Sequence, residues 1–306
     1  MKTHQDILQR FVFEHTPVRG NLVNLTQTFQ QALHKQEMPT GLRCALGELM
    51  AASALLSATL KMHGSLVLQI QSKGLLKLLV VECSSDSTST IKLRATAKWS
   101  DGVANDQNLF ELIQDGQFMI TLDPKDGNQA YQGIVALEGD SISAALENYM
   151  LRSEQIDTKI WLCCDGETAA GMLIQKLPET MNQVTKIQDA DEEDIWNRVG
   201  YLANTVTDNE LLHLPTETLL TRLFNQEDVR LFEASPTQFF CSCTRDSVAN
   251  MLRMLGDDEL NSIIEERGNI EVNCDFCNTL YTFDKVDTTQ LLITETTSNI
   301  TSSKIH

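Results

Sequence analysis

FFCSCTRDSVANMLRMLGDDELNSIIEERGNIEVNCDFCNTLYTF, residues Phe239–Phe283, is the stretch that decides how this chain is organised. It holds four of the eight cysteines, as Cys241-x-Cys243 and Cys274-x-x-Cys277. A structural Zn²⁺ ion accepts four thiolates in a tetrahedron and needs no open position when its role is to crosslink the chain. Two close pairs, separated by enough chain to fold one against the other, meet that requirement. We therefore predict a zinc site at these four cysteines.

Polar neighbours of the cysteines argue against a chance cluster in an apolar core. Ser242 and Thr244 interleave the first pair, and Asp275 and Asn278 flank the second. A single C-x-x-C would be weak evidence, because it also occurs in redox motifs and zinc ribbons. Two pairs within one short segment are much stronger evidence for a metal site.

The one-residue spacing of the first pair departs from the common zinc ribbon, in which both pairs enclose two residues. The pattern resembles the redox-switch domain of the heat-shock protein 33 family, the cytosolic bacterial chaperones. The flanking residues fit that family too: DVRLFE (Asp228–Glu233), FFCSCTRD (Phe239–Asp246), LGDDEL (Leu255–Leu260), GNIEVNCDFCN (Gly268–Asn278) and YTFD (Tyr281–Asp284). Similar segments occur earlier: VRGNLVNL (Val18–Leu25), LGELMAASALLSATLK (Leu46–Lys61), LLVVE (Leu78–Glu82), SEQIDTKIWL (Ser153–Leu162) and AAGMLIQKLP (Ala169–Pro178).

The resemblance implies an ATP-independent holdase chaperone rather than an enzyme, with no catalytic residues. It implies that Cys241, Cys243, Cys274 and Cys277 hold one Zn²⁺ in the reduced form and form disulfides under oxidative stress. Zinc release would then unfold the switch and an adjoining linker, which rests on the N-terminal domain when reduced. The surface exposed in this way would bind unfolding client proteins. A homodimer on activation is a further expectation from the family.

The cysteine spacing has its own consequence for oxidation. If disulfides form within each pair, each closes a very small loop, and the stabilisation by a crosslink shrinks as its loop shortens. Zinc ties the two pairs together, whereas such disulfides do not. Thiolates on zinc are already in the form that oxidants attack, so a structural site can also act as a sensor.

Composition indicates a soluble globular protein: 42% of the 306 residues are hydrophobic and 22% are charged. The N-terminus lacks a signal-peptide pattern, and no segment is expected to approach the roughly 20 apolar residues that span a bilayer. We therefore expect a cytoplasmic protein that has no membrane partner. In that reducing compartment, paired cysteines more often bind metal or sense oxidants than form stable disulfides.

The net charge of −18 is concentrated in residues 181–306, which carry −13 of it. Such acidity disfavours a nucleic-acid partner, because binding to phosphates requires Lys and Arg to displace counterions.

Hydrophobic periodicity predicts an α+β fold for the N-terminal part. Runs at 65–72, 75–85 and 90–99 read as an antiparallel meander, divided by turn-forming residues. Further strands are predicted at 11–14, 117–122, 130–137, 156–163 and 169–177. Helices are predicted at 22–33, 42–62, 109–114 and 141–153. Because the two types do not alternate strictly, α+β is a better description than α/β.

The expected domains are a core and client-binding domain (1–180), a metastable helical linker (181–236), the zinc switch (237–287) and a disordered tail (288–306). Between the cysteine pairs, helices are predicted over Asp246–Leu255 and Asp257–Glu266. They supply a small buried set: Val248, Leu252, Leu255, Leu260 and Ile263.

The remaining cysteines are interpreted as structural. Cys44 belongs to a buried helix, and Cys83, Cys163 and Cys164 lie at or near strand ends, with the adjacent pair pointing to opposite faces. The sequence contains no G-x-x-x-x-G-K-[ST] loop, H-E-x-x-H or G-x-S-x-G motif. Two alternatives stay open: a thiol-disulfide oxidoreductase that uses Cys274-x-x-Cys277, and a zinc-ribbon adaptor that keeps its metal permanently.

Overall fold

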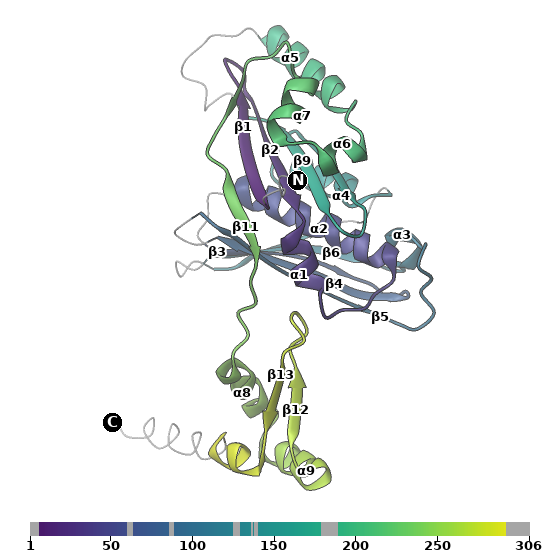
Figure 1. Cartoon of the computed structure of the whole chain (residues 1–306), viewed down its shortest axis with the longest axis vertical. Coiled ribbons are helices and arrows are strands. Elements are labelled where there is room, and N and C mark those ends of the chain that lie inside the picture. Colours follow the sequence, from purple (N-terminus) through teal and green to yellow (C-terminus); the bar gives the residue numbers. More distant parts are fainter. Residues whose placement is uncertain are drawn as a thin grey trace, which may run out of the picture. The chain divides into compact units, whose positions relative to one another are not determined.

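The computed structural model describes residues 6–59, 64–85, 89–124, 129–135, 137, 140–178 and 189–291. The chain forms two compact units, which divide after Phe240 (Figure 1). The strands of the first unit are β1 (Ile7–Phe13), β2 (Val18–Leu25), β3 (Gly64–Gln71), β4 (Leu76–Ser85), β5 (Ile91–Trp99), β6 (Gln117–Pro124), β7 (Tyr131–Val135), β8 (Thr158–Cys164), β9 (Ala169–Lys176), β10 (Val229–Leu231) and β11 (Ser235–Phe239). Its helices are α1 (Gln27–Leu33), α2 (Thr40–Thr59), α3 (Leu109–Leu112), α4 (Ile142–Arg152), α5 (Asp189–Ala203), α6 (Asp208–His213) and α7 (Thr216–Leu223).

One sheet organises the first unit, with strand order β7-β6-β3-β4-β5-β11-β1-β2-β9-β8 and with β10 paired to β1. Its pairings are antiparallel except that of β11 with β5, which is parallel. The predicted meander is confirmed as β3, β4 and β5, whose side chains alternate between buried and partly exposed positions along β3. This sheet and its helices confirm the α+β class.

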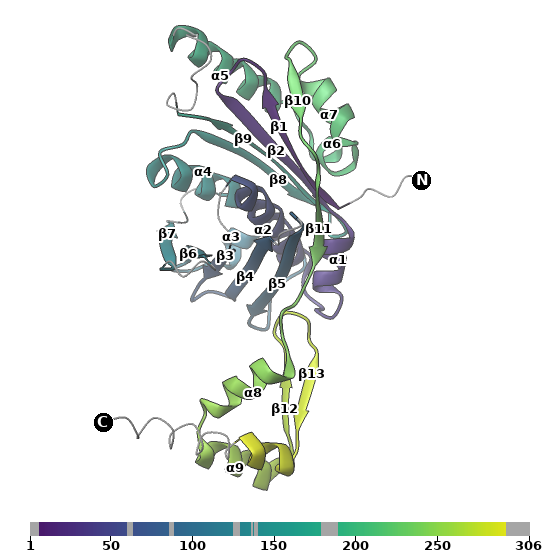
Figure 2. The same ribbon diagram turned by 90° about the vertical axis from the view of Figure 1, so that its left-hand side faces the viewer.

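Helix α2 lies at the centre of the larger of two cores in the first unit, the first core. It packs against strands from both parts of the sheet, including β4, β5, β8 and β9, and Figure 2 shows it between them. By length and composition this 20-residue helix could cross a membrane, so the expectation that no segment approaches that length is wrong. Because 67% of its most apolar window is buried inside the unit, its apolar character is accounted for by core packing.

The second core of this unit lies on the other face of β1, β2 and β9, under α5, α6 and α7 (Figures 1 and 2). Phe11 and Phe13 of β1 belong to it, and Phe224, just after α7, meets Phe13 edge-on at a ring-centroid distance of 4.9 Å. Successive strand residues point to opposite faces. Accordingly Cys163 is buried in the second core, while its neighbour Cys164 packs against the first, as predicted.

Two predictions about local structure are wrong because long-range pairing overrides the local pattern. The helix predicted from Leu22 begins only at Gln27, since the residues before it continue β2 between β1 and β9. The segment predicted as a helical linker does contain α5–α7, but it ends in β10 and the start of β11, which pair with β1. Its residues 181–188 lie outside the described residues.

The second unit consists of α8 (Arg245–Arg253), α9 (Asp257–Arg267) and a hairpin of β12 (Ile270–Asn273) and β13 (Leu280–Phe283), followed by helical residues at 285–291. Helix α9 ends at Gly268, whose φ of 78° is left-handed and directs the chain into β12. The disorder predicted from residue 288 is wrong for its first four residues, because Thr288 and Leu291 are 2% and 7% exposed. Residues 292–306 lie outside the described residues.

Candidate metal centre

The four cysteines singled out in the sequence lie together in the second unit. Cys241 and Cys243 precede α8, and Cys274 and Cys277 lie in the turn of the β12–β13 hairpin. Their four sulfur atoms lie within 4.8 Å of one another. The Sγ atoms of Cys241 and Cys274 are 3.7 Å apart, and those of Cys243 and Cys277 are 3.3 Å apart. We call this group the four-cysteine cluster.

Local hydrogen bonds position each pair. In the hairpin turn, the Cys274 N–H donates to the Thr279 carbonyl (3.0 Å), and the Asn278 N–H donates to the Cys274 carbonyl (2.8 Å). Asn278 has a φ of 52°, a left-handed conformation that asparagine tolerates better than most residues. On the other side, Thr244 caps α8 through a capping box with Ser247, so the chain leaves Cys243 directly into a helix.

The geometry of the four-cysteine cluster fits Zn²⁺. Zn–S bonds of about 2.3 Å in a tetrahedron place the sulfurs about 3.8 Å apart. The two Sγ–Sγ separations given above, 3.7 and 3.3 Å, are near that value, and each pair of cysteines contributes one sulfur to each contact. All four side chains are half-buried, as expected for ligands of a closed structural site.

Two hydroxyl groups lie close to sulfurs of the cluster, one at Cys243 and one at Cys277. The Tyr281 hydroxyl donates to Cys243 Sγ at 3.1 Å, and the Thr279 hydroxyl is 3.2 Å from Cys277 Sγ. Burial opposes ionisation of Cys277, but hydrogen bonds from Thr279 and from the neighbouring cysteines lower its pKa to about 6. Burial raises the pKa of Cys243 to about 12, against the effect of the Tyr281 hydrogen bond.

The surroundings of Cys274-x-x-Cys277 do not suit an oxidoreductase. A redox-active C-x-x-C places its first cysteine at the start of a helix in a βαβ setting. Here Cys274 follows β12, and the motif forms a hairpin turn.

The buried residues predicted around the cluster were partly right. Leu252 and Leu260 are buried, whereas Val248 and Ile263 are only partly buried. Leu255 is 52% exposed, because α8 has already ended at Arg253. Sequence reasoning missed the hairpin and, with it, Tyr281 and Thr279. The alternating LYTF run after the second pair was the available signal for a strand.

Relatives and a solved structure agree with this architecture. Residues 6–284 match the family described as Hsp33 protein. The 33 kDa chaperonin of Methylobacillus flagellatus is 56% identical over 291 residues, 95% of each chain. That of Chromobacterium violaceum is 49% identical over 290 residues, 94% of each chain. The crystal structure of the 33 kDa chaperonin of Thermotoga maritima superposes with a TM-score of 0.78 at 19% identity, covering 95% of this chain and 99% of that one, which shows likeness of fold.

The fold and the site define an α+β protein with a small separate unit built around four clustered cysteines. The chain belongs to the heat-shock protein 33 family, which is a family of chaperones. The resemblance drawn from the cysteine spacing and flanking motifs is thereby confirmed.

Proposed function

We propose that this protein is a cytoplasmic, ATP-independent holdase that oxidation switches on. The observation that carries the proposal is the convergence of sulfurs from two cysteine pairs that are distant in the sequence. The switch consists of Cys241, Cys243, Cys274 and Cys277.

In the reduced protein, these four thiolates hold one Zn²⁺. When bound, the ion crosslinks the segment before α8 to the hairpin, with apparent binding free energies of about 10–16 kcal/mol for such sites. The buried set of the second unit is small: Ala249, Leu252, Leu260, Ile264, Ile270, Phe283 and Leu291. A core of that size supplies only about 3–5 kcal/mol. The crosslink between the pairs therefore decides whether the second unit is folded.

Oxidation of the four cysteines removes the crosslink that keeps the second unit folded. Disulfides within Cys241-x-Cys243 and Cys274-x-x-Cys277 consume all four ligands while leaving the two halves of the unit unlinked. Each loop is so short that the disulfide hardly restricts the unfolded chain. The second unit then lacks both its crosslink and a core large enough to replace it.

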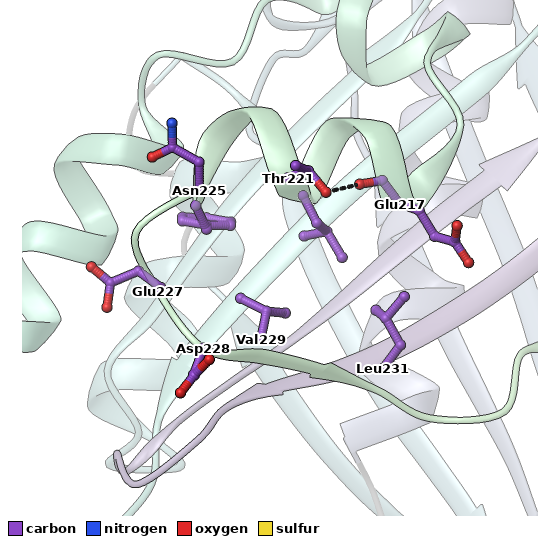
Figure 3. Close-up of a pocket in the computed structure, with 9 residues that line it drawn as sticks. Glu217, Thr221, Asn225, Glu227, Asp228, Val229 and Leu231 are labelled. Carbon is purple, nitrogen blue, oxygen red and sulfur yellow. Dashed lines mark hydrogen bonds between the residues drawn. The ribbon is translucent and has the colours of Figure 1, made fainter.

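The segment that would respond is the linker, α5–α7 with β10, which lies on the face of β1, β2 and β9. A surface hollow of about 420 Å³ lies between α7 and β10 of this linker, and its lining includes apolar Leu220, Val229 and Leu231 and acidic Glu217 and Asp228 (Figure 3). If the linker leaves, the apolar side chains of the second core become exposed, and patches of that kind bind unfolded proteins without nucleotide.

Light scattering of a thermally unfolding client tests the proposal, with ATP absent throughout. We expect peroxide-treated, zinc-free protein to suppress aggregation at a stoichiometry at which the reduced, zinc-loaded protein does not. Equal suppression by the two forms would refute oxidative activation, and no suppression by either would refute the holdase function.

A further inference from the structure

A second cysteine pair lies in the first unit, separate from the four-cysteine cluster. Cys44 is in the first turns of α2, and Cys164 is the last residue of β8. The Cys164 Sγ atom lies against the face of α2 that Cys44 shares with Gly47. These two residues are 120 positions apart in the sequence, and the packing of α2 against β8 brings them together.

The glycine one turn after Cys44 supports the same placement independently. A Cβ added at Gly47 would lie 2.7 Å from Cys164 Sγ, closer than real atoms approach. Positions 44 and 47 share one face of the helix. Glycine is unfavourable inside a helix, and here the missing side chain makes the space that the Cys164 sulfur occupies. The helix face that carries Cys44 is thus shaped to receive this sulfur.

Exposure separates this pair from the other cysteines of the first unit. Cys44 and Cys164 are half-buried, whereas Cys83 and Cys163 are 1% and 4% exposed. Cys163 adjoins Cys164 but points into the second core. An oxidant from solvent can therefore reach Cys44 and Cys164 more readily than either buried thiol.

The interaction between the two sulfurs favours one thiolate and one thiol. Hydrogen bonding with Cys164 lowers the pKa of Cys44 to about 7, with help from Arg43 and against burial and Asp165. The same hydrogen bond, together with burial, raises the pKa of Cys164. Glu48, one turn along α2, has its pKa raised to about 7, by burial first and then by the charge on Cys44. A reactive thiolate beside a protonated thiol is the arrangement in which the first sulfur is oxidised and the second resolves it.

The pair does not belong to a second metal site. Within the ranges that the structure describes, the four-cysteine cluster is the only group in which three or more Cys, His, Asp or Glu ligand atoms converge. Two sulfurs without a converging third ligand suit a disulfide better than an ion.

We propose that Cys44 and Cys164 are a second, zinc-independent redox pair that closes a disulfide between α2 and β8 when the protein meets a peroxide. The Cys44 thiolate attacks one peroxide oxygen, and the O–O bond breaks. This gives a sulfenic acid, and the departing hydroxide takes up a proton to become water. The Cys164 sulfur then attacks the sulfenic sulfur, an S–S bond forms, and a second water leaves. The two thiols lose two electrons, which reduce the peroxide to two waters.

This disulfide would act in the opposite sense to those of the switch. It closes a loop of more than a hundred residues within the first unit, and a crosslink restricts the unfolded chain more as its loop lengthens. Oxidation of this pair would therefore crosslink α2 to the sheet and stabilise the first unit, independently of the state of the four-cysteine cluster. The inference goes beyond the proposed function and does not depend on it.

Peptide mapping of the full-length, zinc-loaded protein after peroxide treatment tests the proposal. Remaining thiols are alkylated under acidic conditions to prevent exchange before digestion. We expect a disulfide that joins the peptide containing Cys44 to the peptide containing Cys164, and we expect it to persist in Cys163→Ala. Recovery of Cys44 as a free thiol, as a sulfinic or sulfonic acid, or linked to Cys163 or to a cysteine of the cluster would overturn the proposal.

A kinetic comparison gives a second readout in the reduced proteins. Removing Cys164 takes away the hydrogen bond that favours the Cys44 thiolate, while the intrinsic reactivity of the sulfur rises in partial compensation. We expect Cys164→Ala to slow alkylation of Cys44 near neutral pH roughly 5- to 10-fold. The matched variant Cys163→Ala should leave that rate unchanged. Equal rates in Cys164→Ala and the wild type would contradict the pairing.

Discussion

At the scale of residues, the hydroxyl of Tyr281 supports the four-cysteine cluster through its hydrogen bond to Cys243 Sγ. Partners of metal ligands hold the ligand in place and stabilise its charge, and losing one typically costs 10- to 100-fold in metal affinity. We expect Tyr281→Phe to weaken zinc binding about 10-fold, measured by competition with a chelating indicator. Tyr201→Phe, at a tyrosine that is 74% exposed, is the control. If Tyr281→Phe binds zinc as tightly as the wild type, the Tyr281 hydroxyl does not support the metal site.

Glu48 makes a pH-dependent contribution to stability. Burial, with smaller effects of Cys44 and Asp208, raises its pKa from 4.5 to about 7. The folded state therefore keeps this proton more tightly than the unfolded state does. Stability from this group is lost as the pH rises from about 4.5 to about 7. Above that range the full cost applies, about 1–2 kcal/mol after allowing for partial exposure.

We expect Glu48→Gln to raise the free energy of urea unfolding by about that 1–2 kcal/mol near pH 8 and by little near pH 5. Glu37→Gln, at an exposed position, should change neither value. A gain that is the same at both pH values would show that the side chain acts through packing rather than through its charge.

Residue-level prediction depended on how local each signal was. The four-cysteine cluster could be predicted, because the spacing of each pair is a local feature with a chemical meaning. The contact between Cys44 and Cys164 could not, since it depends on which helix packs on which strand. Tyr281 is an intermediate case. Its nearness to the second cysteine pair can be read from the sequence, but the side to which its side chain points depends on the register of the β12–β13 hairpin.

At the scale of elements, the second unit is stabilised by a small core and by the proposed zinc crosslink. A substitution at Leu260 tests how much each contributes to its folding stability. Leu260 of α9 is fully buried. Truncating such a leucine costs about 2–5 kcal/mol, comparable to the whole stability that we assign to this core. We expect Leu260→Ala to leave the unit protease-resistant with zinc bound and to unfold it at lower chelator concentration than the wild type. Leu255→Ala, at a residue that is 52% exposed, should behave as wild type.

If chelator-treated Leu260→Ala protein is as resistant to protease as the zinc-loaded wild type, the crosslink is unnecessary for folding of the second unit.

Among the elements, the meander β3–β5 and helix α2 could be predicted because their apolar patterns are long and regular. The short strands β10 and β11 could not, because they form by pairing with β1, which is far away in the sequence.

At the scale of the whole molecule, the account requires that docking of the linker restrains activity. Phe224, 2% exposed, anchors the linker against Phe11 and Phe13. Replacing a buried phenylalanine by alanine costs about 3–5 kcal/mol, so the linker should detach in part without oxidation. We expect Phe224→Ala to suppress client aggregation in its reduced, zinc-loaded form.

Tyr201→Ala, which alters an exposed aromatic on α5 of the same linker, is the matched control and should remain inactive when reduced. The contrary result would be a reduced, folded Phe224→Ala protein whose linker is shown by hydrogen exchange to be detached but which still fails to hold clients. It would show that linker release is not sufficient for activity.

The two-unit organisation could be anticipated from the cysteine-rich C-terminal segment. The pairing of β11 with β1 and β5 keeps residues up to Phe239 in the first unit, which ends at Phe240.

The most direct test of the switch follows zinc and thiols together in one sample of the full-length protein. Zinc released to a colorimetric indicator is measured during a peroxide titration, and the oxidised cysteines are identified by differential alkylation at each step. The account predicts one zinc per chain in the reduced protein, released in step with oxidation of Cys241, Cys243, Cys274 and Cys277. Zinc that stays bound while these four cysteines are oxidised, or reduced protein that binds no zinc, would contradict it.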